Sequence, residues 1–326
     1  MTSPFATERL SASAGDLERA RAILDAGGVV AFPTETVYGL GADATDPEAV
    51  ARIFAAKERP RFNPLIAHLA DVGAAFRQGR FDAMAQALAE AFWPGPLTLV
   101  VPTSPDCTIS DLARAGLDSV ALLVPAHPLA RDLLARFGRP LAAPSANRSG
   151  RVSPTTADHV LADLDGRIHA VIDDGVTKVG LESTIVACLG GTPRLLRPGG
   201  IPRGDIERVV GGVVQEHGDA GSAPRAPGML ASHYAPKARV RLNATEIFPG
   251  EAGLLFGPVT PKGADAAKAR LNLSKRGDLL EAAAHLFAHL RALDASGAAT
   301  IAVSPIPDHG LGEAINDRLR RAAADR

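Results

Sequence analysis

The chain has 326 residues, of which 46% are hydrophobic and 22% charged, and its formal net charge at pH 7 is −1. This composition is ordinary for a globular protein, and the near-neutral charge excludes a global positive field that would draw the chain onto nucleic acid or an anionic membrane. The length exceeds the roughly 250–300 residues that one core usually serves, which predicts two domains.

The first two thirds of the chain alternate between helical and extended patterns. Residues 16–26 predict a helix that Gly27 and Gly28 end, and the apolar run at 29–32 predicts a buried strand. The elements expected next, in chain order, are a helix opened by Asp46 and Pro47, a helix through 81–92, a turn at 93–96, strands at 97–101 and 120–124, a helix at 128–137, a strand at 141–143 and a hairpin with strands at 184–189 and 194–197. Such alternation predicts a layered α/β domain over residues 1–212.

Glycines and prolines break all periodicity between residues 211 and 236, which predicts a linker at 213–238. Its bulky residues, including His233 and Tyr234, are unusual for a passive spacer and indicate that the linker packs on another part of the molecule. The elements expected after it are strands at 253–256 and 300–303 and helices at 278–293 and 314–324. They predict a smaller α/β domain with a parallel sheet over residues 239–326.

Two features bear on the compartment. Cys107 and Cys188 form no CxxC pair, which indicates two reduced thiols rather than a zinc or redox site. Residues 1–10 lack the apolar run of a signal peptide, and no stretch approaches the roughly 20 apolar residues of a membrane helix. We therefore expect a cytoplasmic protein without membrane association.

The common catalytic and phosphate-binding motifs are missing from the sequence, since GxxxxGK[ST], GxGxxG, HExxH and GxSxG do not occur. Small polar and basic residues gather instead after expected strands and helices, namely in 33–41, at Lys57 and Arg59, in 63–68, in 145–149, at 183–184 and at Arg197. Ligands of open α/β sheets bind at strand ends, and these donors without a nucleophile–base pair suit an anion. The residues by themselves predict an anionic, phosphorylated small molecule as ligand.

The same segments resemble the threonylcarbamoyl-AMP synthase family in its long, two-domain form. The matching segments, in chain order, are residues 33–41, 57–59, 63–68, 93–98, 143–147, 182–184, 196–200, 226–236 and 310–319. The resemblance implies a twisted mixed-sheet YrdC-type domain with a large concave cleft, a linker that packs over the active site, and a smaller Rossmann-like α/β domain at the C-terminus.

The activity implied by the resemblance is that of a nucleotidyltransferase, L-threonylcarbamoyladenylate synthase. It would form threonylcarbamoyl-AMP and pyrophosphate from L-threonine, bicarbonate and ATP, for the threonylcarbamoyladenosine modification of tRNA. Mg²⁺ would be carried by ATP rather than by a protein metal site. The product would pass to the tRNA threonylcarbamoyl transferase complex.

The resemblance also assigns roles to residues of this chain. Threonine would be held by Thr36, His68, Ser183 and the backbone of Ala143. ATP would be held by Arg59, Asn63, Ser119, Ser145, Asn147, Ser153, Arg197 and Tyr234. Lys57 and Arg59 would be the catalytic cations, with Lys57 and Asn147 acting on the phosphates or bicarbonate.

Two positions depart from the family pattern. Leu123 stands where the family usually has an arginine that would pair with the threonine carboxylate, and Ala187 stands where aspartate is frequent. A carboxylate without its charged partner loses about 2–5 kcal/mol, or roughly thirty-fold to several thousand-fold in affinity. Arg148 is a candidate substitute. Two interpretations stay open: a working synthase with altered threonine affinity, or an impaired member that retains ATP binding.

Two alternatives come from other classes. Arg59, Arg61, Arg148, Arg151 and Arg203 could form a basic face for double-stranded RNA, with binding that is salt-dependent and independent of threonine. The loss of an arginine at position 123 would also suit a carbamoyl-adenylating enzyme whose amine substrate carries no carboxylate.

Overall fold

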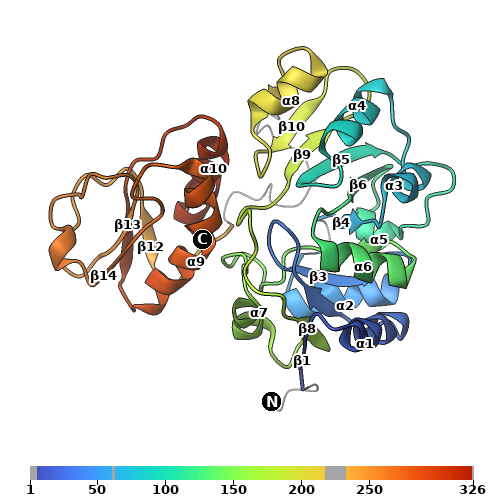
Figure 1. Ribbon diagram of the computed structural model, residues 1–326, viewed down its shortest axis with the longest axis horizontal. Helices are drawn as coiled ribbons and strands as arrows, with labels where there is room; N and C mark the ends of the chain where they lie inside the picture. Colours follow the sequence, from blue (N-terminus) through green and yellow to red (C-terminus); the bar gives the residue numbers. More distant parts are fainter. Residues whose placement is uncertain (1–5, 61–62, 217–232, 325–326) are drawn as a thin grey trace.

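The computed structural model describes residues 6–60, 63–216 and 233–324, and it contains two sheets (Figure 1). The larger sheet has eleven strands in the order β1-β8-β2-β3-β7-β4-β6-β5-β9-β10-β11. Its strands are β1 (Glu8–Leu10), β2 (Val30–Phe32), β3 (Gly39–Asp43), β4 (Ile66–His68), β5 (Leu97–Pro102), β6 (Ser119–Leu123), β7 (Leu141–Ala142), β8 (Ala170–Ile172), β9 (Thr184–Ala187), β10 (Arg194–Arg197) and β11 (Gln215–Glu216). The last strand lies beyond residue 212, where we placed the end of this domain.

This sheet contains both parallel and antiparallel pairs of strands. β4 runs parallel to β6, with His68 opposite Leu123, whereas β5 runs antiparallel to β6. The hairpin expected around residues 190–193 is confirmed, because β9 and β10 pair antiparallel. The sheet is therefore mixed, as expected.

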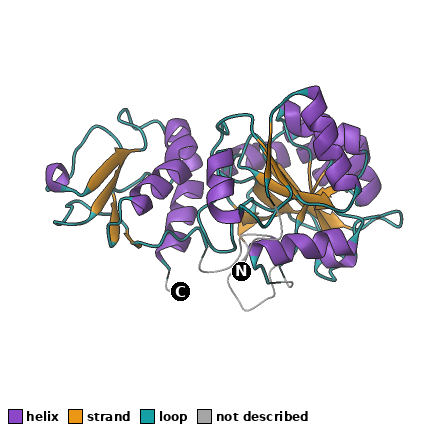
Figure 2. Cartoon of the chain, turned by 90° about the horizontal axis from the view of Figure 1, so that it is seen from below, coloured by secondary structure: helices purple, strands orange, loops and turns teal. Residues whose placement is uncertain are grey.

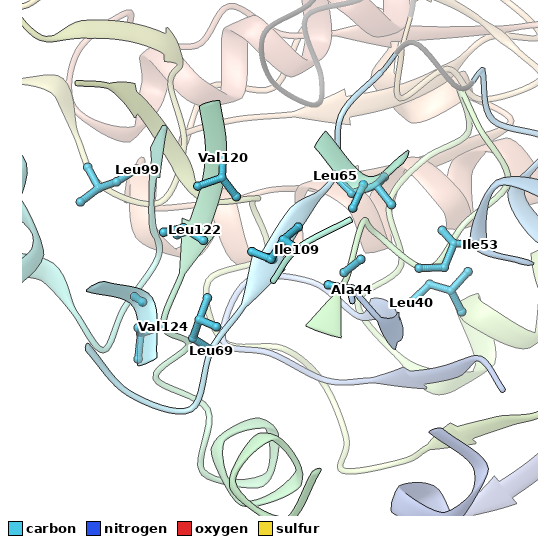
Figure 3. Packing of buried hydrophobic residues seen from close by; sticks show 14 of the residues in the cluster. Leu40, Ala44, Ile53, Leu65, Leu69, Leu99, Ile109, Val120, Leu122 and Val124 are labelled. Carbon is cyan, nitrogen blue, oxygen red and sulfur yellow. The ribbon is translucent and has the colours of Figure 1, made fainter. Parts of the chain in front are cut away.

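Helices cover the two faces of the sheet unequally. The helices of this domain are α1 (Ala14–Asp25), α2 (Pro47–Lys57), α3 (Val72–Gln78), α4 (Ala83–Phe92), α5 (Asp111–Arg114), α6 (Pro128–Phe137), α7 (Ala157–Leu164) and α8 (Arg203–Val210). Apolar residues of α2, α4, α5, α7 and α8 pack on one face, and α1 and α6 cover β8, β2 and β7 on the other. Figure 2 shows helices on both sides of the strands of the larger domain. Figure 3 shows part of the first core, with Ile53 of α2 and Leu122 of β6 among its members. Strands β4, β5, β6, β9 and β10 carry a separate apolar group on the second face.

The sequence analysis left β3 within a polar turn, but the structure makes it a fully buried strand paired with β2. The reason lies at Gly41, where a Cβ atom would come within 2.7 Å of the Phe32 ring. Glycine lets the ring lie against the strand backbone, and a hydrophobicity pattern does not record that contact.

The C-terminal domain has four strands in the order β12-β15-β13-β14, all parallel, as the sequence predicted. Its elements are β12 (Arg239–Arg241), β13 (Ala252–Leu255), the 3₁₀ helix η1 (Ala264–Ala266), β14 (Ala269–Asn272), α9 (Leu279–Ala295), β15 (Thr300–Val303) and α10 (Leu311–Ala323). α10 begins earlier than the expected residue 314, directly after Gly310.

Helices α9 and α10 face the larger domain (Figure 1). Arg291 of α9 forms an ion pair with Asp163 of α7 at 2.7 Å, and Arg203 of α8 pairs with Glu313 of α10 at 2.5 Å. At Gly180, with φ +72°, a Cβ would lie 2.5 Å from the carbonyl oxygen of Ala283. The two domains therefore meet backbone to backbone at a position that only glycine fits.

Candidate active site

A cavity with a volume of about 50 Å³ lies on the second face of the large sheet, where β4, β6 and β7 end and β9 begins. Its lining residues are Thr34, Thr36, Val37, Gly39, Arg59, Ile66, His68, Leu123, Ala143, Pro144, Ser145, Glu182, Ser183, Arg197, His233 and Tyr234. The cavity joins the loop after β2, the strand ends and the segment before β12. The expected site residues in this lining are Thr36, Arg59, His68, Ala143, Ser145, Ser183, Arg197 and Tyr234.

One side of the cavity presents hydroxyls and a neutral imidazole. The hydroxyl of Thr34 lies 2.7 Å from that of Thr36 and donates to the carbonyl of Val37, which fixes the loop after β2. Burial lowers the pKa of His68 to about 4, so its ring is uncharged at neutral pH. Its Nδ1 atom has no partner among the described residues. These groups can exchange hydrogen bonds with a polar ligand without adding charge.

Another side carries a buried cation. Arg197 donates from Nη2 to the carbonyl oxygen of Ser183 at 2.8 Å and to its hydroxyl at 3.1 Å. The Ser183 hydroxyl also lies 2.7 Å from that of Thr98. Burial lowers the pKa of Arg197, but a guanidinium starts so high that it stays protonated. An oriented positive charge thus faces the cavity beside a hydroxyl.

Arg59 supplies a second cation, and burial lowers its pKa to about 10. Its Nη2 donates to the carbonyl of Pro64 at 3.2 Å, whereas Nε has no partner among the described residues. Both polar side-chain atoms of Asn63 are likewise buried and unpartnered there. Buried polar groups are normally paired, so these unpaired donors fit a ligand rich in oxygen acceptors.

Lys57 stands behind the lining rather than in it. Its ammonium donates to the carbonyl oxygens of Ser145 and Asn147, and burial pushes its pKa well below the usual value. The Asn147 amide in turn donates to the carbonyls of Arg148 and Arg151. In this structure Lys57 and Asn147 therefore shape the loop that carries Ser145.

The C-terminal domain contributes a charge to the site. Glu182, in the lining, accepts from the Ser153 hydroxyl at 2.5 Å and from Nε of Arg318 at 2.8 Å. Arg318 belongs to α10 and is fully buried, and it also pairs with Asp317. Arg318 thus compensates the negative charge of Glu182. The sequence analysis placed Ser153 on ATP, and the structure puts it one hydrogen bond behind the cavity.

Two aromatic side chains from the segment before β12 close the cavity. Tyr234, with φ +61°, stacks on Phe287 of α9 at 5.6 Å and lies 5.1 Å from the Arg318 guanidinium. The His233 ring contacts Tyr234 edge-on at 4.1 Å. The remaining volume suits only one or two water molecules, so a nucleotide can enter only if this closure opens. The expected linker at 213–238 lies largely outside the described residues.

Leu123 lines the cavity next to His68 and is 3% exposed. Arg148 does not replace the expected arginine, because its side chain is exposed, forms an ion pair with Glu58 and lies outside the lining. Ala187 belongs to the same apolar group as Leu123, on the same face of the sheet. The wall beside His68 is therefore apolar.

Ser119 is a further expected residue outside the lining. It begins β6 and lies on the same face as Leu123, roughly 13 Å away along the strand. Its assignment to ATP stays a prediction.

The arginines considered for RNA do not form one solvent-facing surface. Arg59 is buried, and Arg148 and Arg203 are held by Glu58 and Glu313. Arg61 lies outside the described residues.

The sequence analysis missed Thr34, Ile66, Glu182 and His233 as lining residues. Thr34, Glu182 and His233 lie within segments that it did single out (33–41, 182–184 and 226–236), but it gave these three residues no role at the site. For Ile66, the relevant fact is that it lies on the same strand face as His68, two residues away.

The described residues offer no obvious protein site for a metal ion. No cluster of three or more His, Cys, Asp or Glu side chains gathers within the described ranges. The donors that line the cavity are suited to phosphate oxygens, with which a divalent cation can enter. Over the same ranges, no helix combines the length and the apolar character that crossing a membrane requires.

Comparison with protein families gives two matches that together span nearly the whole chain. Residues 22–199 match the family model for Sua5, YciO and YrdC proteins, described as "Telomere recombination". Residues 201–324 match the model described as "Threonylcarbamoyl-AMP synthase, C-terminal domain".

Individual relatives agree with these matches. The threonylcarbamoyl-AMP synthase of Bacillus subtilis is 42% identical, over 98% of this chain and 96% of its own. That of Pyrococcus abyssi is 42% identical over 92% of both chains. The crystal structure of P. abyssi Sua5 complexed with L-threonine superposes with a TM-score of 0.88 at 37% identity and covers 97% of both chains.

Proposed function

The chain belongs to the threonylcarbamoyl-AMP synthase family, and we propose that it is a working L-threonylcarbamoyladenylate synthase. It would act as a nucleotidyltransferase on L-threonine, bicarbonate and ATP. The observation that carries this proposal is the division of one cavity into a neutral side, with Thr36 and His68, and a cationic side, with Arg59 and Arg197. The hydroxyls and neutral imidazole of one side suit the amine and hydroxyl of threonine, and the cations of the other side suit a triphosphate.

The reaction needs no covalent enzyme intermediate. The threonine amine attacks the carbon of bicarbonate and water leaves, which gives a carbamate. A carbamate oxygen then attacks the α-phosphorus of ATP, and pyrophosphate leaves with the bonding electrons. Catalysis by this chain then consists of bringing the reactants together and stabilising the charge on the phosphates. That is consistent with a site that contains arginines, hydroxyls and amides but no nucleophile–base pair.

The neutral side would hold the threonine. The unpaired Nδ1 of His68 can accept a hydrogen bond from the amine, and the Thr36 and Ser183 hydroxyls can bind the polar groups. Ile66 and Leu123 offer an apolar surface to the methyl group. The carboxylate finds no cation on that wall, and Arg197 of the neighbouring wall, beside Ser183, is assigned to the ATP phosphates. We therefore propose that threonine binds more weakly here than it would with an arginine at position 123.

The cationic side would hold ATP. Arg59 and the Asn63 amide have donors without described partners, and Arg197 is oriented by the carbonyl of Ser183. Mg²⁺, bound to the phosphates, would neutralise part of their charge. Tyr234 and His233 line the cavity and leave little space in it, so ATP would have to displace them. The segment that carries them, before β12, could then close over the nucleotide.

Pyrophosphate release tests this proposal. Purified protein is supplied with ATP, Mg²⁺ and bicarbonate, with and without L-threonine, and the nucleotide product is identified by mass spectrometry. Threonine-dependent release together with threonylcarbamoyl-AMP is the expected result. If the protein binds ATP but releases no pyrophosphate in response to threonine, even at about 100 mM threonine, it is instead an impaired member of the family.

A further inference from the structure

A second, larger cavity lies outside the active site. It has a volume of about 620 Å³ and lies past the end of β4, between α3 and α6. β4 ends at His68, which lines the active site, and the next two residues, Leu69 and Ala70, line the second cavity. The volume is within the roughly 300–1,000 Å³ of sites that bind small molecules.

One buried amide is oriented in this cavity. Gln78, at the end of α3, is 6% exposed, and its Oε1 accepts from the backbone nitrogen of Thr108 at 2.9 Å and from its hydroxyl at 3.2 Å. These bonds fix the oxygen toward Thr108. The amide nitrogen donates to no group in the described part of the chain, so its hydrogen bonds are left for solvent or a ligand acceptor.

One cation of the cavity is also available. Arg139 is held by Asp25 at 3.0 Å and Asp43 at 2.8 Å. Arg77, next to Gln78, is exposed at the rim and forms no ion pair with the described residues. A ligand anion can therefore take a charge-assisted hydrogen bond from Arg77 and a second bond from the Gln78 amide.

The rest of the wall is mixed, with Thr45 and Asp71 as further polar residues and an apolar part from β4, α3 and α6. The Asp71 carboxylate is engaged at the start of α3, where it accepts from the backbone nitrogen of Ala74 at 2.7 Å. Leu69 comes from the core shown in Figure 3, and Ala74 of α3 faces Leu134 and Ala135 of α6 across the cavity. We propose that this cavity binds a small molecule with an anionic group on an apolar body, and that the bound molecule acts as an effector of the active site.

The coupling route is short. The backbone nitrogen of Leu69 donates to the carbonyl oxygen of Leu123 at 2.9 Å, and Leu123 pairs with His68 across β4 and β6. A shift of Leu69 on ligand binding would therefore act directly on Leu123 and, through the strand pairing, on His68. The effect on threonine use rests on the proposed function, whereas ligand binding in the second cavity does not.

The probe for binding is 1-anilinonaphthalene-8-sulfonate, which combines a sulfonate with aromatic rings and fluoresces when it is desolvated. Titration is done on the wild type, on Arg77→Ala and on Ala135→Trp, which fills the cavity. The matched controls are Arg80→Ala, an exposed arginine outside the lining, and Ala83→Trp, an exposed position on α4. Saturating ATP is added in a parallel titration to exclude probe bound in the active site.

We expect one saturable site, weakened about fivefold by Arg77→Ala and at least about tenfold by Ala135→Trp, with both controls like the wild type. Equal affinity in all variants, no saturable binding, or displacement by ATP would overturn the site. With the site intact, saturating probe should change the KM for threonine at least twofold (about the smallest shift that kinetics resolves) in the wild type and not in Ala135→Trp. An unchanged KM would overturn the effector role alone.

Discussion

Leu123 is the position at which the chemistry of the site can be tested most sharply. Its side chain is buried next to His68 and Ile66, on a wall without a cation. The change Leu123→Arg places a guanidinium where the threonine carboxylate is expected. Leu123→Met is the matched control, because it keeps the volume and polarity of the wall and should cost less than about 1.5 kcal/mol in stability.

The expected change in the KM for threonine follows from giving the threonine carboxylate a charged partner that it otherwise lacks. Truncating one partner of a buried charge pair costs about 2–5 kcal/mol, so supplying the missing partner should lower the KM for threonine by roughly thirty-fold or more. Without substrate, the new arginine is itself a buried, unpaired charge. The Leu123→Arg protein should therefore be less stable than the wild type in the absence of threonine, and threonine should stabilise it more strongly.

The assay is pyrophosphate release against threonine concentration, with thermal unfolding in the presence and absence of threonine. Threoninol, which lacks the carboxylate, is the matched substrate control and should show no gain with Leu123→Arg. A folded Leu123→Arg protein whose KM for threonine equals that of Leu123→Met would refute the reasoning. The carboxylate would then be bound elsewhere in the cavity, most directly by Arg197 beside Ser183.

Three further predictions concern stability. The folded pKa of His68, about 4, lies below its ordinary value of 6.5, so the free energy of unfolding should fall by up to about 3 kcal/mol as the pH falls from 6.5 toward 4. In urea unfolding, His68→Asn should show a weaker pH dependence, because one proton fewer is taken up on unfolding. Gly180→Ala should separate the domains and speed proteolysis between them, whereas Gly175→Ala, also left-handed but with free space around it, should cost only about 1 kcal/mol. Arg318→Met should destabilise the protein by about 3–5 kcal/mol because Glu182 stays charged and buried, and adding Glu182→Gln should restore part of that loss in urea unfolding.

Periodicity predicted much of the fold. α9 and α6 carry apolar residues at helical spacing, and both begin and end within a few residues of the expected bounds. α3, α7 and β1 were missed, because seven- or eight-residue helices and a three-residue strand are too short for a pattern to develop. Their positions are set by tertiary contacts, such as the main-chain pairing of β1 with β8 across more than a hundred residues.

The sequence predicted which segments form the site, but not which of their residues line the cavity. Segments rich in hydroxyls and cations do converge on one cavity, yet the sequence could not separate residues that face it from those one contact behind. Lys57 is an example, because its ammonium is used entirely on backbone carbonyls. Arg318 is the opposite case, since no local pattern on α10 reveals that a helical arginine compensates Glu182, 136 residues earlier in the chain.

The Arg318 contact explains how the second domain takes part in the site. Glu182 lies at the cavity wall, where an uncompensated carboxylate would repel the phosphates of an incoming nucleotide. Arg318 of α10 holds that charge, and the same guanidinium lies against the Tyr234 ring that closes the cavity. Opening the closure changes the surroundings of Arg318 and hence the field at Glu182. The position of α10 relative to the larger domain therefore determines how well the negative charge of Glu182 is compensated at the cavity wall.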